Sequence, residues 1–298
     1  MASEKLNRLH DLLRSYGSCL VAYSGGVDSV FLARVARDVL GEKSLAVIAD
    51  SASLPRRELE EALEIAGRFE IPVRVVHTRE FDNPEYLANP SNRCYFCKHE
   101  LFTELAPLAR EGGFSVIVYG ENASDSADFR PGAKAAAEFQ VCAPLKEVGL
   151  TKAEIRELSA QLGLPTADKP QMACLSSRIP HGEAVSPEKL RMVEAAERLL
   201  RDLGFHDVRV RHHELVSNSP ITGSAVRHLA RIEVGVTEMA IFLKDGYPTR
   251  ISEAMKKIGY SHVTLDLAGY RRPGDNGLMA RNLQTIPGAD ATSGRRIA

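Results

Sequence analysis

Residues 19–40 read CLVAYSGGVDSVFLARVARDVL: a short apolar segment, a glycine-rich turn, and a segment with apolar side chains at helical spacing. We expect a strand over Cys19–Tyr23, a turn over Ser24–Ser29 and a helix over Val30–Leu40. At such a junction the free N–H groups and the dipole of the helix favour an anion, and glycine allows the backbone to approach it closely. The stretch therefore predicts a phosphate-binding loop.

The residues of this turn suit a nucleotide phosphate. Gly25 and Gly26 permit close approach, Ser24 and Ser29 add hydroxyl donors, and Asp28 can hold Mg²⁺ on the phosphates. The chain has neither the Gly-Lys-Ser/Thr of a Walker loop nor a G-x-G-x-x-G motif here, so hydrolysis of a γ-phosphate and binding of a dinucleotide are disfavoured. The alternative is a tight turn that needs glycine only for its shape.

Similar strand-and-helix alternation continues along the first half of the chain. Short strands predicted between helices indicate βαβ units and a Rossmann-like parallel sheet with both faces covered, an α/β fold. Thr151 to Glu154 form a capping box that opens a further helix ending at Leu162. The predicted strands are Ser44–Ala49, Val73–His77 and Val116–Tyr119, and the predicted helices are Pro55–Phe69 and Cys94–Arg110.

The second half predicts a smaller α+β domain. A proline-containing loop over Leu164–Gly182 separates the two, so we expect domains at 1–182 and 183–272, with 273–298 as a flexible tail. The predicted helices are Ser186–Leu203, Glu238–Leu243 and Ile251–Ile258, and the predicted strands are Val208–His213, Ala230–Val234 and His262–Leu267.

Overall composition excludes several classes of protein. The 298 residues include 38 Lys and Arg against 39 Asp and Glu, so net charge indicates neither nucleic acid nor an acidic membrane as partner. Met1–Tyr16 is amphipathic rather than signal-like, and no run is long enough to span a membrane, which predicts a cytoplasmic protein. Thiols are reduced there, and Cys19 and Cys142 lie in apolar strands, where core packing is expected.

Three other cysteines suggest chemistry. Cys94 and Cys97 form a CxxC at the start of a predicted helix, and Cys174 follows much later. Zinc would need a fourth ligand, such as His99 or His181. A redox pair and a [4Fe–4S] cluster held by the three thiolates are the other interpretations.

Polar residues near Cys174 predict an anion site. Ser177 and Arg178 follow it closely, and the arginine could hold a phosphate and favour the thiolate. Arg209 and Arg211 alternate with a valine, so they share one face of a strand and could bind the same substrate phosphate. The alternative for both sets is a solvated polar surface.

The turn at Ser24–Ser29 resembles the PP-loop of the ATP pyrophosphatase superfamily, which implies adenylation by ATP with release of pyrophosphate. The whole chain over residues 5–272 is similar to the LarE family of ATP-dependent sulfur transferases. The resemblance implies that Asp50, Ser51, Gly120 and Asn122 lie at the ATP site. It is carried by the turn, by Gly120–Asn122 with Asp125, Asp128 and Arg130–Gly132, by Ala173–Pro180, Arg209–Arg211 and Ala230–Val234, and by Leu265–Leu267 and Gly269–Arg271.

Membership would imply a particular reaction. The substrate would be a small nucleotide, pyridinium-3,5-biscarboxylic acid mononucleotide, whose carboxylate becomes a thiocarboxylate during nickel-pincer cofactor synthesis. In some members the cysteine matching Cys174 gives up its own sulfur and leaves dehydroalanine. In others three cysteines bind a [4Fe–4S] cluster, and because the matching Cys94, Cys97 and Cys174 are all present here, the resemblance favours the cluster, with the sacrificial role of Cys174 as the alternative. The resemblance also implies a homo-oligomer.

Three alternatives compete with this reaction. A PP-loop enzyme that thiolates tRNA would also use cysteines, but it would need a basic face. A synthetase that uses ammonia would need a glutaminase partner and no CxxC. A nucleotide sensor would bind ATP without turnover.

Overall fold

The computed structural model describes residues 2–127, 131–219, 223–244 and 246–270. The predicted tail and the motif residues Asp128, Arg130 and Arg271 lie outside these ranges.

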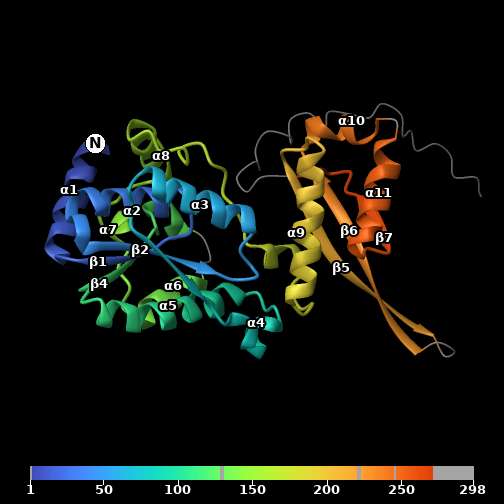
Figure 1. Cartoon of the computed structure of the whole chain (residues 1–298), viewed down its shortest axis with the longest axis horizontal. Coiled ribbons are helices and arrows are strands. Elements are labelled where there is room, and N and C mark those ends of the chain that lie inside the picture. Colours follow the sequence, from blue (N-terminus) through green and yellow to red (C-terminus); the bar gives the residue numbers. More distant parts are fainter. Residues whose placement is uncertain (1, 128–130, 220–222, 245, 271–298) are drawn as a thin grey trace, which may run out of the picture.

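The first part of the chain is built on a four-stranded parallel sheet with the order β3-β2-β1-β4 (Figure 1). One face is covered by α1, α2, α3, α7 and α8, and the other by α5 and α6, each through its own apolar core. The predicted Rossmann-like α/β class is therefore confirmed. The elements are α1 Ala2–Tyr16, β1 Cys19–Ala22, α2 Val27–Leu40, β2 Ser44–Asp50, α3 Arg56–Arg68, β3 Val73–His77, α4 Pro84–Leu87, α5 Arg93–Glu111, β4 Val116–Tyr119, α6 Pro131–Glu138, α7 Pro144–Glu147 and α8 Lys152–Gln161.

The second part has its own three-stranded sheet, in the order β5-β6-β7, with an apolar core against α9, α10 and α11 (Figure 1). β5 and β6 pair antiparallel from Val208↔Val234 to Ser219↔Gly223, so both strands are much longer than predicted. Their far ends extend beyond the covering helices as an arm (Figure 1). The elements are α9 Pro187–Asp202, β5 Val208–Ser219, β6 Gly223–Val234, α10 Met239–Phe242, α11 Tyr247–Ile258 and β7 His262–Leu265.

A fourth, smaller core connects the two parts. Tyr86 of α4, Leu175 and Ile179 pack with Leu190 and Val193 of α9. The loop predicted over Leu164–Gly182 contains one short 3₁₀ helix, Leu175–Arg178, and is otherwise irregular. This loop runs between the sheets, and the position of the domain boundary at 182/183 stays a prediction.

Candidate active site

The predicted phosphate loop joins β1 to α2. Gly25 has a φ of 72°, and a Cβ there would lie 2.7 Å from Ala62 Cβ, so both conformation and space require glycine. The Ser24 and Ser29 hydroxyls are 3.0 Å apart, and Ser29 Oγ also accepts from Ser24 N. No side chain caps α2, whose first N–H groups therefore remain available for a ligand.

The end of β4 lies against this loop. A Cβ at Gly120 would lie 3.0 Å from Ser29 N and 3.1 Å from the Asp28 carbonyl carbon, so only glycine allows the approach. Asn122 is fully buried, with Nδ2 3.4 Å from Asp28 Oδ1. β1 and β4 are the neighbours at which the strand order reverses, the usual place for a ligand in such sheets.

The other two predicted ATP residues follow β2. Asp50 forms an ion pair with Arg56, and Ser51 Oγ lies 2.7 Å from Ser53 Oγ. Neither residue lines the cavity at the phosphate loop. Their proximity to adenosine stays a prediction.

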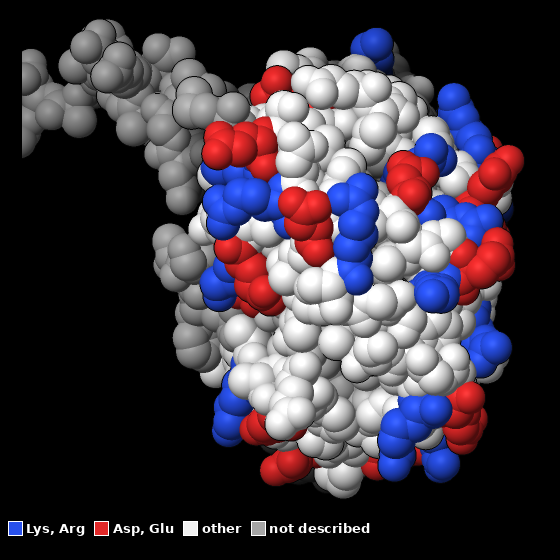
Figure 2. Space-filling model, turned by 90° about the vertical axis from the view of Figure 1, so that its left-hand side faces the viewer, with Lys and Arg blue, Asp and Glu red and all other residues white. Residues whose placement is uncertain are grey.

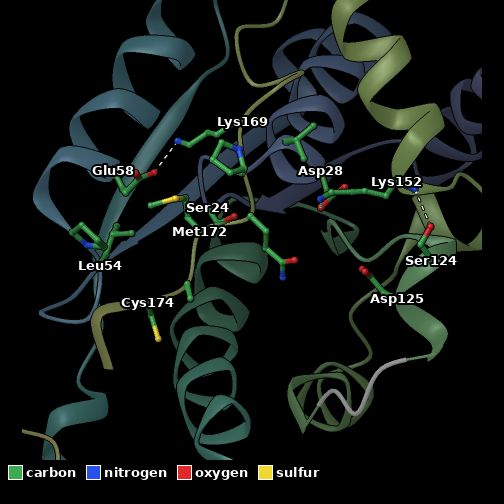
Figure 3. A pocket seen from close by; sticks show the side chains of 16 residues that line it. Ser24, Asp28, Leu54, Glu58, Ser124, Asp125, Lys152, Lys169, Met172 and Cys174 are labelled. Carbon is green, nitrogen blue, oxygen red and sulfur yellow. Dashed lines mark hydrogen bonds and ion pairs between the residues drawn. The ribbon is translucent and has the colours of Figure 1, made fainter. Parts of the chain in front are cut away.

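A cavity of about 470 Å³ extends from the phosphate loop to Cys174. Ser24 and Asp28 line it together with Lys152 of α8, whose Nζ lies 2.5 Å from Asp28 Oδ2. Figure 3 shows Cys174 well apart from Asp28 and Lys152, with its sulfur directed away from them. The cavity thus brings a nucleotide-binding loop and a thiol to one space, although they are about 150 residues apart in sequence.

Arg178 has contacts that differ from the prediction. Its side chain is 2% exposed, with Nε 2.8 Å and Nη2 3.1 Å from the Glu197 carboxylate, and Nη1 donates to the carbonyls of Ala173 and Cys174. Burial alone would lower the pKa of Arg178, but Glu197 outweighs it and the pKa is raised. Arg178 thus holds the Cys174 segment in the described structure, and a substrate phosphate would have to compete with Glu197 for it; the phosphate role stays a prediction.

A second buried arginine holds the same segment from the other side. Arg93 donates to Asn89 Oδ1 and to Ser176 O at 3.1 Å, and its Nη2 lies 4.0 Å from Cys174 Sγ. Asn89 donates in turn to the carbonyls of Ile179, Pro180 and Glu183. Sequence reasoning missed both residues; the only signal was the arginine directly before the CxxC.

The three cysteines are neighbours without forming a ready ligand set. Burial raises the pKa of Cys97, and Glu80 and Cys174 raise it further. Desolvation and then Cys174 raise the pKa of Cys94, although residue Cys94 is exposed as a whole. Across the described ranges no three His, Cys, Asp or Glu side chains lie close enough together to hold a metal ion. That finding concerns a single ion; the three thiols lie close enough to raise one another's pKa, and a cluster held by Cys94, Cys97 and Cys174 stays a prediction.

A second cavity, of about 850 Å³, adjoins the first and shares Lys152 and Lys169–Met172 with it. Arg209 lines it beside Tyr270, with its guanidinium 5.0 Å from the ring centre; its Nε is buried and has no hydrogen-bond partner in the described structure. Arg211 shares the strand face of Arg209, as predicted, because Val210 between them is in the core. It pairs with Glu233 and donates to Ser177 O at 2.9 Å. Of the four predicted phosphate ligands, Arg209 is the best placed to bind a phosphate, because it lines this cavity and its Nε has no hydrogen-bond partner in the described structure.

Charged side chains of both signs are spread over the face shown in Figure 2. Figure 2 shows acidic and basic side chains interspersed over one face, with no large patch of either sign. Among the described helices, none has the length and apolar character to cross a bilayer.

Sequence comparisons identify relatives that match most of the chain. No family model matches the chain. An uncharacterised protein of Synechocystis sp. is 42% identical over 271 residues, 91% of this chain and 96% of its own. Pyridinium-3,5-bisthiocarboxylic acid mononucleotide synthase of Lactiplantibacillus plantarum is 31% identical over 84% of this chain and 86% of its own.

A more distant match gives the superfamily. One component of the glutamine-hydrolyzing GMP synthase of Archaeoglobus fulgidus is 27% identical over 62% of this chain and 65% of its own. This similarity, together with the loop after β1, indicates an ATP-using enzyme of the PP-loop superfamily. Within that superfamily, the chain belongs to the LarE family.

Proposed function

We propose that the enzyme is an ATP-dependent sulfur transferase. It adenylates a carboxylate of pyridinium-3,5-biscarboxylic acid mononucleotide, then replaces the activated oxygen with sulfur and so contributes to nickel-pincer cofactor synthesis. The single observation that carries the proposal is the cavity shared by the phosphate loop and Cys174. The named activity of the relative from L. plantarum supports this choice of substrate. We expect the protein to act in the cytoplasm as a homo-oligomer, with neither membrane nor nucleic acid as partner.

The first step needs the phosphate loop. Ser24, Gly25, Gly26 and Ser29 would bind the pyrophosphate portion of ATP, and Asp28 would hold Mg²⁺, which neutralises phosphate charge when bound. A substrate carboxylate oxygen attacks the α-phosphorus, and the bond to the β-phosphate oxygen breaks. Pyrophosphate leaves and an acyl adenylate forms. Arg209 would hold the substrate's own phosphate, and Arg211 could join it only by leaving Glu233.

The second step needs a sulfur nucleophile. Sulfur attacks the carbonyl carbon of the mixed anhydride, and AMP leaves with the electron pair of the broken C–O bond. We assign Cys174 as the source, because it is the thiol that lines the cavity. If Cys174 gives up its own sulfur, a base must then remove its Cα proton as the Cβ–S bond breaks, so that the thiocarboxylate leaves with the electron pair of that bond and dehydroalanine remains. Cys94 and Cys97 would hold a cluster together with Cys174 if one binds, and no step here depends on it.

The test is anaerobic incubation of the protein with Mg²⁺, ATP and the dicarboxylated nucleotide. We expect AMP and pyrophosphate in equal amounts and a product in which sulfur has replaced one oxygen, detected by mass spectrometry. Cys174→Ala should still release pyrophosphate but form no thiocarboxylate. Nicotinic acid mononucleotide, which has one ring carboxylate, is the control substrate. Formation of ADP, or thiocarboxylate formation by Cys174→Ala, would contradict the proposal.

A further inference from the structure

Lys152 is predicted from the sequence only as the first residue of a helix, but the fold places it in the ATP cavity. Its Nζ lies 2.5 Å from Asp28 Oδ2, across 124 residues of sequence. Lys152, Asp28 and Asp125 line the same cavity (Figure 3). The side chain of Lys152 is 32% exposed and that of Asp28 is 20% exposed, so the pair is open to an incoming ligand.

The backbone of Lys152 is fixed, although its side chain is not. Lys152 N donates to Ser124 Oγ at 3.1 Å. Thr151 and Glu154 form a capping box around it, and Lys5 Nζ lies 2.7 Å and 2.8 Å from the Glu154 carboxylate. The ammonium group sits at the end of a flexible four-carbon stem. It can change partners within the cavity without any movement of α8.

The lysine occupies an oxygen that a metal ion would need. Mg²⁺ binds carboxylate oxygens at about 2.0–2.1 Å, which leaves no room for an ammonium group at hydrogen-bond distance on the same lone pair. A metal on that lone pair of Asp28 must therefore displace Lys152, and a metal on a neighbouring lone pair is repelled by the ammonium charge. The displaced ammonium stays in a cavity that receives phosphates, its favoured charged acceptors.

We propose that Lys152 is an internal counter-ion of the ATP site. It pairs with Asp28 while the site lacks ligand, releases the carboxylate to Mg²⁺, and contacts the nucleotide phosphates when MgATP binds. This inference rests on the proposed function, because it assumes that ATP binds at the phosphate loop.

The test exploits opposite effects on two ligands. Lys152→Met removes the competitor for the metal, so Mn²⁺ alone, measured by electron paramagnetic resonance, should bind about two- to fivefold more tightly. The same variant loses a charged contact to phosphate, so magnesium pyrophosphate and MgATP, measured by calorimetry, should bind about tenfold or more weakly. Lys152→Arg should recover most of the pyrophosphate affinity.

Lys134→Met is the matched control. It also removes a lysine that pairs with a carboxylate, that of Glu138, but one that does not line the cavity. We expect unchanged affinity for both ligands. If Lys152→Met weakens both ligands together, or changes neither, the inference is wrong. If the wild-type protein binds Mn²⁺ but no ATP, the proposed function fails, whereas tighter Mn²⁺ binding by the variant still supports the Lys152–Asp28 pairing.

Discussion

Gly25 combines two separate requirements for glycine at one residue. Its φ of 72° lies in the left-handed region, which costs other residues backbone strain. Its missing Cβ also leaves the space that Ala62 of α3 fills. Gly17 has the same φ of 72°, yet a Cβ there would meet nothing within 4 Å. A comparison of alanine substitutions at Gly17 and Gly25 therefore separates the cost of backbone strain from the cost of steric overlap.

Gly25→Ala should destabilise the protein more than Gly17→Ala. We expect about 1 kcal/mol from backbone strain at either position. Overlap with Ala62 should add about 1–3 kcal/mol at Gly25 only. ATP affinity should fall in Gly25→Ala alone, because the loop must move. Urea unfolding and ATP titration measure the two effects, and equal losses of stability and affinity in both variants would refute the prediction.

At the scale of elements, the start of α8 joins three parts of the protein. Thr151 and Glu154 cap the helix reciprocally, as the sequence predicted. Lys5 of α1 binds the same glutamate, so the cap also attaches α1 to α8. The bond to Lys5, followed by those to Thr151, lowers the pKa of Glu154 from 4.5 to about 2. The carboxylate form is therefore favoured by folding.

Glu154→Gln should make stability less dependent on pH in acid. A carboxyl group whose pKa is lowered by folding contributes stability that is fully present above its unfolded pKa and is lost as pH falls through its folded pKa. For Glu154 this window runs from about 4.5 down to about 2. The urea midpoint of the wild type should thus fall more steeply across the window than that of the variant, which cannot titrate there. Parallel curves would rule out this linkage.

At the scale of the whole molecule, the Cys174 segment depends on both parts of the chain. Arg178 is tied to Glu197 of α9, and Ser177 to Arg211 of β5. Leu175 and Ile179 share a core with Leu190 of α9, whereas Leu200 of the same helix belongs to the core under the second sheet. Helix α9 thus supports two different regions, each through a buried leucine.

Leu190→Ala should loosen the Cys174 segment, and Leu200→Ala should not. Both leucines are fully buried, so each substitution should cost about 2–5 kcal/mol. Only Leu190→Ala opens the core beneath Leu175 and Ile179, so amide hydrogen exchange over residues 173–180 should accelerate in that variant alone. Similar exchange in the two variants would show that the segment is ordered without the junction core.

Local structure was largely predictable. The strands Val73–His77 and Val116–Tyr119 have the predicted bounds: β4 is a short apolar run that is largely buried, and β3, at the edge of the sheet, is a short run rich in valine. The paired strands β5 and β6 were predicted too short. The added residues, after His213 in β5 and before Ala230 in β6, do not alternate regularly between apolar and polar, and they are held by cross-strand pairing that no local pattern reveals. Helix α6 was missed for a similar reason: eight residues with one apolar face depend on packing against α5.

The sequence by itself determined the phosphate loop, the capping box and the α/β class, because glycines, caps and apolar periodicity act on neighbouring residues. Only the tertiary structure decided which charges meet. Arg178 reaches Glu197 and Lys152 reaches Asp28 across 19 and 124 residues. The site depends on these pairings, because a charged side chain takes whichever opposite charge the packed elements bring within a few ångströms, whatever its distance along the chain.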